Sequence, residues 1–212
     1  MNIRIVYFAI LISFALNSFN CWSQEIIKKT DSNSGWLSVG GRSTLSLFDG
    51  DGTGLGTGGQ FRIQLSNQVN TDWFADYITI NVQDKVRSDY YHIGWSVLYY
   101  PIKNLDYPKT VQPYIVAGHC FDFNKKTSLS DASNTQQRWG SAVQAGMGTH
   151  FNITDRFDVS LTCQYMIHLT KELDAEIDGN TVTITEIKQS SLEGHLLSTV
   201  SLNYKLFKLW KK

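Results

Sequence analysis

Residue types that can do chemistry are concentrated in one glycine-rich segment, residues 48–60, which reads FDGDGTGLGTGGQ. It matches the dinucleotide-binding pattern G-x-G-x-x-G at Gly54, Gly56 and Gly59. It also matches the start of an EF-hand calcium loop at Asp49, Asp51, Thr53 and Gly54. Both motifs need a helix beside them, so the neighbouring residues decide between the alternatives.

Neither motif has the flanking structure that it requires. The segment follows SVGGRSTLSL and precedes QFRIQLSN, which both alternate like strands, so no helix N-terminus is available for a pyrophosphate. The twelfth calcium-loop position is Gln60, where a bidentate Glu is needed. Two carboxylates alone seldom hold a cation. We therefore predict no cofactor and no metal site, and interpret FDGDGTGLGTGG as a hairpin loop whose glycines supply positive φ.

The first 23 residues have the features of a secretory signal peptide. Arg4 precedes an apolar run, residues 5–16, and small residues before Gln24 suit cleavage there. The run is too short to span a bilayer. We expect a signal peptide at 1–23 and a linker at 24–34, while Cys21 leaves a lipidated N-terminus open as an alternative.

Composition excludes several classes of protein. Lysine plus arginine balance aspartate plus glutamate at 19 each, which predicts no nucleic-acid partner. The mean hydropathy of −0.21 does not fit a helical membrane protein. Cys120 and Cys163 fall on predicted strands that are not neighbours, about 10 Å apart and too far for a disulfide, so we expect free thiols.

Alternation of apolar and polar residues is the dominant pattern after the signal segment. In 157–177 one parity is apolar and the other is serine, threonine, glutamine and histidine. The fifth run has no clear apolar face, and Asp76 interrupts the apolar parity of the third, which includes Ile78 and Ile80. Eight runs follow this pattern: 35–46, 57–68, 73–84, 89–101, 111–122, 138–153, 157–177 and 191–207.

The polar parity predicts which face of the strands looks inward. A soluble barrel would carry lysine and glutamate outside, but here the polar positions are mostly uncharged. A polar interior and an apolar exterior in lipid fit better, because a charge at the bilayer midplane costs about 2–4 kcal/mol. Arg42 and Arg62 would then point inward and need counter-charges, which the pattern does not identify.

Aromatic residues gather at the two ends of the predicted strands, as expected for girdles at two lipid–water interfaces. One group contains Trp36, Trp73, Phe74, Tyr99, Tyr100, Tyr114, Phe151, Phe157, Tyr204 and Phe207. The other contains Tyr90, Tyr91, Phe121 and Trp139. Connections are mostly short at one end and long at the other, with the short DKVRS as the exception.

With these features the chain resembles the small eight-stranded outer-membrane β-barrels of the OmpX and OmpA-transmembrane-domain type. The resemblance covers residues 35–207 and includes a last strand, LLSTVSLNYKLF, that ends in an aromatic residue before a basic tail at 208–212. It implies an all-β, antiparallel up-and-down barrel in the outer membrane of a Gram-negative cell. It also implies contact with outer-membrane lipids and lipopolysaccharide, and with the barrel-assembly machinery during biogenesis.

Function is then expected in the outer loops, as adhesion, recognition or a structural role, because side chains fill an eight-stranded barrel. Asp178-Gly179 is a strong turn signal between two alternating segments, so strands seven and eight should continue as a protruding hairpin. Its edge could recruit a protein by β-augmentation.

An enzyme is the main alternative, since some barrels of this type modify lipid A. Histidines on the polar parity are His92, His150, His168 and His195. For a deacylase the pair to test is His168 with Ser160 or Glu172, but each histidine is interpreted first as an interior residue, so no catalytic residue is predicted. A narrow conduit for small apolar solutes and a soluble ligand-binding barrel in the periplasm are further alternatives.

Overall fold

A computed structural model describes residues 34–48, 52–102, 110–170, 173–179, 181–186 and 194–210. The predicted signal peptide, the start of the linker, the carboxylates of Asp49 and Asp51, and Glu172 lie outside these residues. Within the described parts of the chain, no helix is long and apolar enough to cross a membrane.

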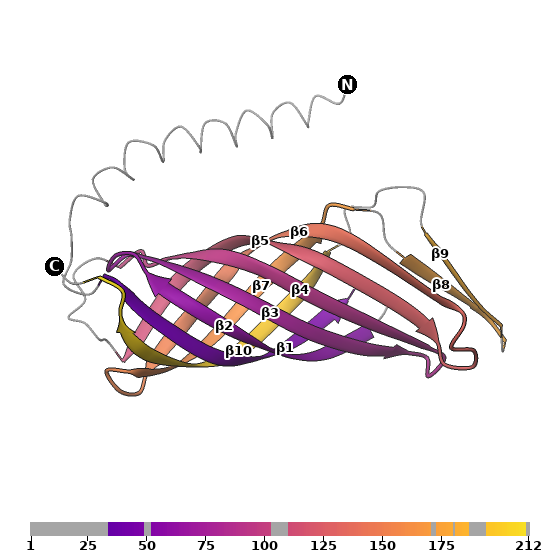
Figure 1. Cartoon of the computed structure of the whole chain (residues 1–212), viewed down its shortest axis with the longest axis horizontal. Helices are drawn as coiled ribbons and strands as arrows, with labels where there is room; N and C mark the ends of the chain where they lie inside the picture. Colours follow the sequence, from indigo (N-terminus) through magenta and orange to yellow (C-terminus); the bar gives the residue numbers. More distant parts are fainter. Residues whose placement is uncertain are drawn as a thin grey trace, which may run out of the picture.

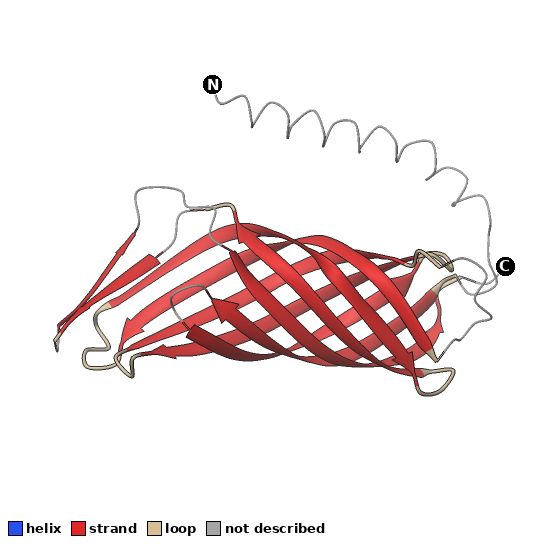
Figure 2. Cartoon of the chain, turned by 180° about the vertical axis from the view of Figure 1, so that it is seen from behind, coloured by secondary structure: helices blue, strands red, loops and turns tan. Residues whose placement is uncertain are grey.

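Eight long strands form one closed antiparallel barrel, in the order β1-β10-β7-β6-β5-β4-β3-β2 (Figures 1 and 2). β1 begins and β10 ends at one end of the barrel, and a separate hairpin, β8–β9, projects beyond the other (Figure 1). We call these the terminal end and the hairpin end. The barrel strands are β1 (Trp36–Phe48), β2 (Gly52–Gln64), β3 (Val69–Val82), β4 (Val86–Tyr99), β5 (Val111–Ser128), β6 (Thr135–Asn152), β7 (Phe157–His168) and β10 (Gly194–Lys208).

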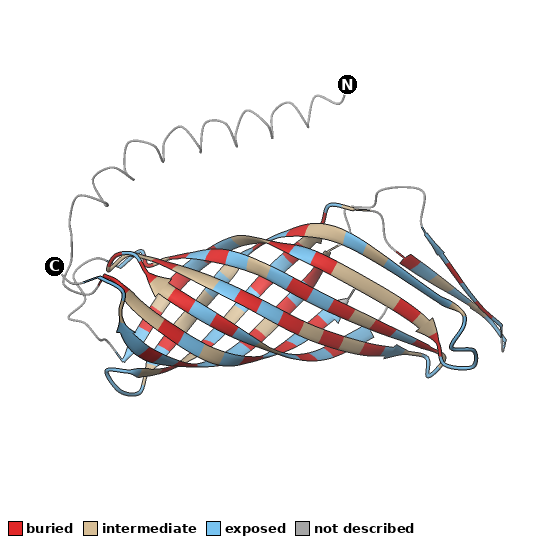
Figure 3. Ribbon diagram, in the orientation of Figure 1, coloured by how far each residue is buried: buried red, intermediate tan, exposed pale blue. Residues whose placement is uncertain are grey.

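The alternation in the sequence becomes an inner and an outer wall. Buried and exposed positions alternate along the strands (Figure 3), and the exposed side chains include most of the large apolar ones. The polar parity lines the interior, as predicted. The face of β5 that the sequence left open is also settled: Ile115 and Phe121 point outward, and Asp122 points inward.

β3 is an exception to the predicted orientation. Its apolar residues Ile78 and Ile80 are buried inside the barrel, at 0% and 3% exposure, on the same inner face as Asp76. The prediction that Asp76 interrupts an outer apolar face is therefore wrong. Asp76 belongs to the inner face of β3, and this inner face is apolar toward the hairpin end. Four residues assigned to the girdles also point inward, because their parity faces the lumen: Phe74, Tyr90, Tyr100 and Tyr114.

The glycine-rich segment is not the hairpin loop that the sequence predicts, because β2 already begins at Gly52. Its inward glycines lie beside large side chains of β3: a Cβ at Gly54 or Gly56 would overlap Ile78. Glycine is needed here because the neighbouring strand fills the lumen. Among the described residues of this segment, positive φ is found only at Gly52, at 99°.

Inward glycines recur between two polar partners that lie on the strands at either side. Gly58 is paired in register with Arg42 on β1 and Asp76 on β3, and these two side chains meet across it at 3.0 Å. Gly40 lies in the same way between Gln60 and Asn203, whose hydrogen bond is 2.6 Å.

Two further cases are Gly118, between Ser96 and Gln144, and Gly148, between Tyr114 and Thr162. A missing side chain on the middle strand thus lets strands two apart interact directly. We call these four contacts the glycine-bridged contacts.

The predicted protruding hairpin exists, but it is separate from the barrel sheet. β7 ends at His168, where the sequence predicts a strand running to residue 177, and β8 (Leu173–Asp178) pairs with β9 (Thr181–Glu186). Gly179 follows β8 with a φ of 56°, which agrees with the predicted turn. Cys120 is buried and Cys163 is exposed, and both are free thiols as expected.

Replacing Gly58 by valine should destabilise the barrel, because a Cβ there would overlap the Ala75 carbonyl and the Asp76 carboxylate. We expect a loss of about 1–3 kcal/mol in the free energy of unfolding, typical of overpacking. Gly59→Val is the matched control, since a Cβ at Gly59 points outward and meets only the Gly40 carbonyl, at 3.8 Å. Urea unfolding in lipid vesicles, followed by tryptophan fluorescence, measures both, and equal losses would contradict the prediction.

Candidate functional site: the barrel interior and the hairpin end

The interior supplies the counter-charge that the sequence could not identify for Arg42. Its guanidinium pairs with Asp76 and lies over the Phe74 ring, 4.5 Å from the ring centre. Arg42 and Asp76 are both almost fully buried. Asp76 lies two strands away from Arg42, so only the register and the gap at Gly58 bring them together. Sequence reasoning had no signal for this pair.

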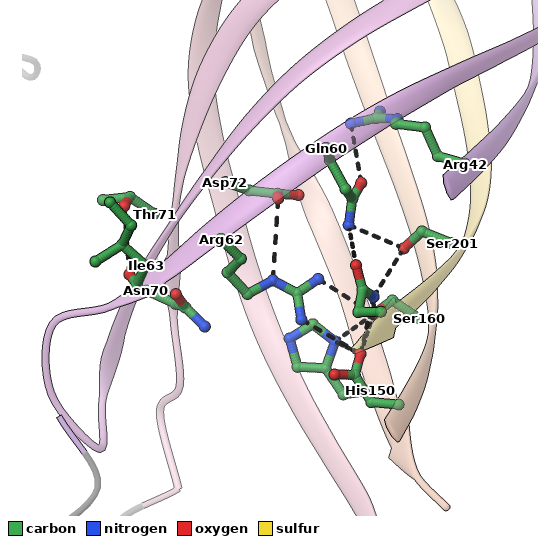
Figure 4. Close-up of polar contacts among 12 residues, drawn as sticks. Arg42, Gln60, Arg62, Ile63, Asn70, Thr71, Asp72, His150, Ser160 and Ser201 are labelled. Atoms are coloured by element: carbon green, nitrogen blue, oxygen red, sulfur yellow. Dashed lines mark hydrogen bonds and ion pairs between the residues drawn. The ribbon is translucent and has the colours of Figure 1, made fainter. Parts of the chain in front are cut away.

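Arg62 is held in a second network nearer the terminal end (Figure 4). It pairs with Asp158 at 3.3 Å and approaches Asp72 at 3.9 Å. Asp158 also accepts hydrogen bonds from Asn203, at 2.9 Å, and from Ser160, at 3.1 Å. A buried arginine thus has two carboxylates, which compensate the loss of water around it.

Three of the inward histidines gather around one carboxylate in the half nearer the hairpin. Asp122 lies 2.7 Å from His168 Nδ1 and 3.3 Å from His92 Nε2. The His195 ring is 4.9 Å from that of His168, and its Nδ1 lies 3.1 Å from the Ser46 hydroxyl. The sequence placed these histidines on the inner face, but it did not predict that they meet.

This histidine cluster does not form a metal centre in the structure. Across the residues described, no group of three or more histidine, cysteine, aspartate or glutamate side chains is arranged to hold a metal ion. The cluster is instead a set of buried polar groups that contact one another.

The His168–Ser160 pair suggested for a deacylase is not assembled, while the alternative partner Glu172 lies outside the described residues. His168 lies with Asp122, eight residues along β7 from Ser160, which is about 26 Å in a strand. The buried Ser160 instead contacts His150 Nδ1 at 2.5 Å, and Asp158 lies beside them.

Ser160, His150 and Asp158 do not have the geometry of a catalytic triad. In a catalytic triad the serine and the acid contact opposite nitrogens of the imidazole. Here the nitrogen nearest to Asp158, at 3.7 Å, is the Nδ1 that already contacts Ser160. The other nitrogen, Nε2, lies 2.8 Å from the Tyr100 hydroxyl. His150 is therefore a satisfied interior residue, as the sequence favoured.

The interior leaves little free space between these groups. One cavity, lined by Arg42, Arg62 and Thr162 among others, has a volume of about 10 Å³. A second cavity of about 10 Å³ lies toward the hairpin end, next to Asp122 and Arg138. Each has room for about one water molecule. Apolar side chains pack inside the barrel between and beside the polar networks, including Ile78, Met166, Leu98 and Val116.

The β8–β9 hairpin is fixed to the barrel rim through its apolar face. Val182 and Ile184 pack against the fully buried Val86 at the start of β4. Asn134 of the β5–β6 loop donates a 2.7 Å hydrogen bond to the Val182 carbonyl. Lys85 of the β3–β4 turn donates another to the Gly179 carbonyl. The hairpin is thus a positioned element of the rim.

A closed eight-stranded antiparallel barrel with an apolar outer wall and a packed polar interior is the fold of the small outer-membrane β-barrels. No family model and no curated protein sequence matched the chain. Solved structures did match, and all those given below are outer-membrane or surface proteins by name.

A major outer membrane protein from Thermus thermophilus has a TM-score of 0.54 at 10% identity, covering 80% of this chain and 99% of that one. Outer membrane protein AlkL, solved by solid-state NMR in lipid bilayers, gives 0.52 at 15% identity, covering 87% and 96%. Neisserial surface protein A gives 0.50 at 13% identity, covering 81% and 96%. At these identities the likeness concerns the fold.

Removing one partner of the Arg42–Asp76 pair should cost more than removing both. Arg42→Met leaves the Asp76 carboxylate buried without its counter-charge, for an expected loss of about 3–5 kcal/mol in the free energy of unfolding. The double variant Arg42→Met/Asp76→Leu should recover most of that loss. Urea unfolding of both variants in vesicles measures the difference, and a double variant as unstable as the single one would contradict it.

Purified protein in planar bilayers should show no steady ion conductance. The reason is that side chains fill the lumen and leave cavities of about 10 Å³. A steady single-channel current that scales with protein concentration would show that the interior opens.

Proposed function

We propose that this protein is an outer-membrane surface protein that recognises a partner through its hairpin end. The location is supported by an outer wall of large apolar side chains and by the fold shared with outer-membrane barrels. The hairpin end then faces outward from the cell and the terminal end faces the periplasm. The longest connection of the barrel, between β7 and β10, contains the hairpin and lies at the hairpin end, which supports this orientation, although the β1–β2 and β3–β4 connections at that end are short.

The observation that carries this proposal is the two-faced hairpin. Its inner face packs on Val86, so its position relative to the barrel is set. Its outer face is exposed and polar, with three acids on β8 opposite three threonines on β9 in register: Asp174 and Thr185, Glu176 and Thr183, Asp178 and Thr181. The packing of the hairpin on the barrel uses only its apolar face and does not explain the residues of its exposed polar face.

The hairpin also offers backbone groups for pairing. Among the residues described, β8 and β9 hydrogen-bond in a sheet only with each other. An extended segment of a partner can add to such an edge through main-chain hydrogen bonds, with side chains giving specificity. The three carboxylates favour a partner segment that carries basic residues.

The interior supports this proposal better than it supports the alternatives. Polar networks and apolar side chains pack inside the lumen, and the two cavities described above each have a volume of only about 10 Å³, too small for a small-molecule ligand. The serine–histidine contact between Ser160 and His150 is buried and lacks triad geometry. Recognition at the outer rim needs neither an open lumen nor a reactive centre.

Deleting residues 174–188 should leave the barrel folded and abolish partner binding. The measurement is adhesion of cells that display the full chain, the deletion or the variant Asp174→Asn/Glu176→Gln/Asp178→Asn to an array of immobilised extracellular proteins. The charge variant should weaken binding of basic partners and leave the hairpin in place, since its changes lie on the outer face.

Folding of each variant is checked by fractionation and by faster gel migration of the unboiled outer-membrane protein. Binding that persists after the deletion would overturn the hairpin as the recognition site. A folded protein found only in the soluble periplasmic fraction would overturn the proposed location.

A further inference from the structure

The outer wall across β3, β4, β5 and β6 carries a continuous aromatic row near the hairpin end. Tyr77, Tyr91, Phe123 and Trp139 are direct register partners from strand to strand. Adjacent ring centres lie 4.9, 5.7 and 4.9 Å apart along the row. Rings of this kind are typical of the level where the apolar core of a membrane meets its headgroups.

The wall becomes polar immediately beyond this row, one outward position further along each strand. The first polar row consists of Thr79, Asp89, Lys125 and Gln137. The second consists of Asn81, Arg87, Thr127 and Thr135. Outward side chains on a strand repeat about every 7 Å, so the change from aromatic to polar is sharp. This change marks the outer lipid–water boundary, given the proposed location.

Arg87 is preorganised at this boundary. Its Nη2 donates a 2.7 Å hydrogen bond to the Tyr77 hydroxyl, and its Nε donates a 3.0 Å hydrogen bond to Asp89. The Tyr77 hydroxyl itself donates to Asp89 at 2.6 Å. The Arg87 side chain nevertheless keeps 49% of its surface exposed. Tyr77 of the aromatic row therefore holds the Arg87 guanidinium in place and leaves it accessible.

Lys125 adds a second cation on the neighbouring strand. Its register partner on β4 is Asp89, and it points to the same outer face as Arg87. Together Arg87, Asp89 and Lys125 carry a net charge of +1 at the level of lipid headgroups. We call Arg87 and Lys125 the rim cations.

We propose that the rim cations bind the phosphate of a phosphorylated lipid headgroup in the outer leaflet, with its acyl chains against the aromatic row. Guanidinium and ammonium groups are the side chains that bind phosphate best, and a guanidinium can do so with two hydrogen bonds. The row of rings below supplies the apolar contact that a free phosphate cannot use. This inference rests on the proposed location, and it involves none of the hairpin residues.

The test uses the purified full chain in detergent and native mass spectrometry. The probes are bisphosphorylated lipid A, the same lipid after removal of its phosphates, and inorganic phosphate. Arg87→Gln/Lys125→Gln is compared with Lys208→Gln, which removes a cation over the Trp36 ring, 5.6 Å from its centre, at the opposite end of the barrel. Faster migration of the unboiled protein confirms that each variant is folded.

We expect the wild-type chain and Lys208→Gln to prefer the phosphorylated lipid, and Arg87→Gln/Lys125→Gln to bind it about tenfold more weakly. Equal binding of the two lipids by the wild-type chain would overturn the proposal, as would an equal loss in Lys208→Gln. Displacement of the lipid by inorganic phosphate at similar concentration would make free phosphate the ligand and overturn it too. If the wild-type chain fractionates with the outer membrane but shows one of these binding results, the lipid-binding proposal is rejected and the proposed location still stands.

Discussion

The glycine-bridged contacts, in which side chains two strands apart meet across an inward glycine, are the interactions on which the rest of this barrel depends. An eight-stranded lumen is narrow, and polar groups inside it must find partners in the protein. Neighbouring strands already meet through their backbones, but their inward side chains compete for the same space. Where the middle strand has a glycine, partners two strands apart meet, as Arg42 and Asp76 do across Gly58.

The same constraint explains why the chemistry of the interior is structural. Arg62 has carboxylates on two sides, and His150 uses both ring nitrogens in contacts with Ser160 and Tyr100. Groups engaged in this way stabilise one packed arrangement. The elements that are free to interact with other molecules lie on the outer wall and the rim.

The short β3–β4 turn gives the hairpin end its shape. It spans only residues 83–85 and lies at the point on the rim between Val82 and Val86. The β8–β9 hairpin packs its apolar residues onto that point, and Lys85 of the turn contacts Gly179. The residues around this short turn are thus the docking place for the projecting hairpin.

Period-two alternation predicted the eight strands, because every strand of such a barrel has one wall in lipid and one in the lumen. The mostly uncharged residues of the polar parity then predicted that the polar wall faces inward. The turn after Asp178 was also readable, since it depends on local backbone geometry. Tertiary structure alone decided the inner face of β3 and the role of the glycines, because both depend on what the neighbouring strands place in the lumen. It also decided that Asp76 serves Arg42 and that three histidines meet around Asp122. Such pairings arise from the register between strands far apart in the chain, which single-strand periodicity does not encode.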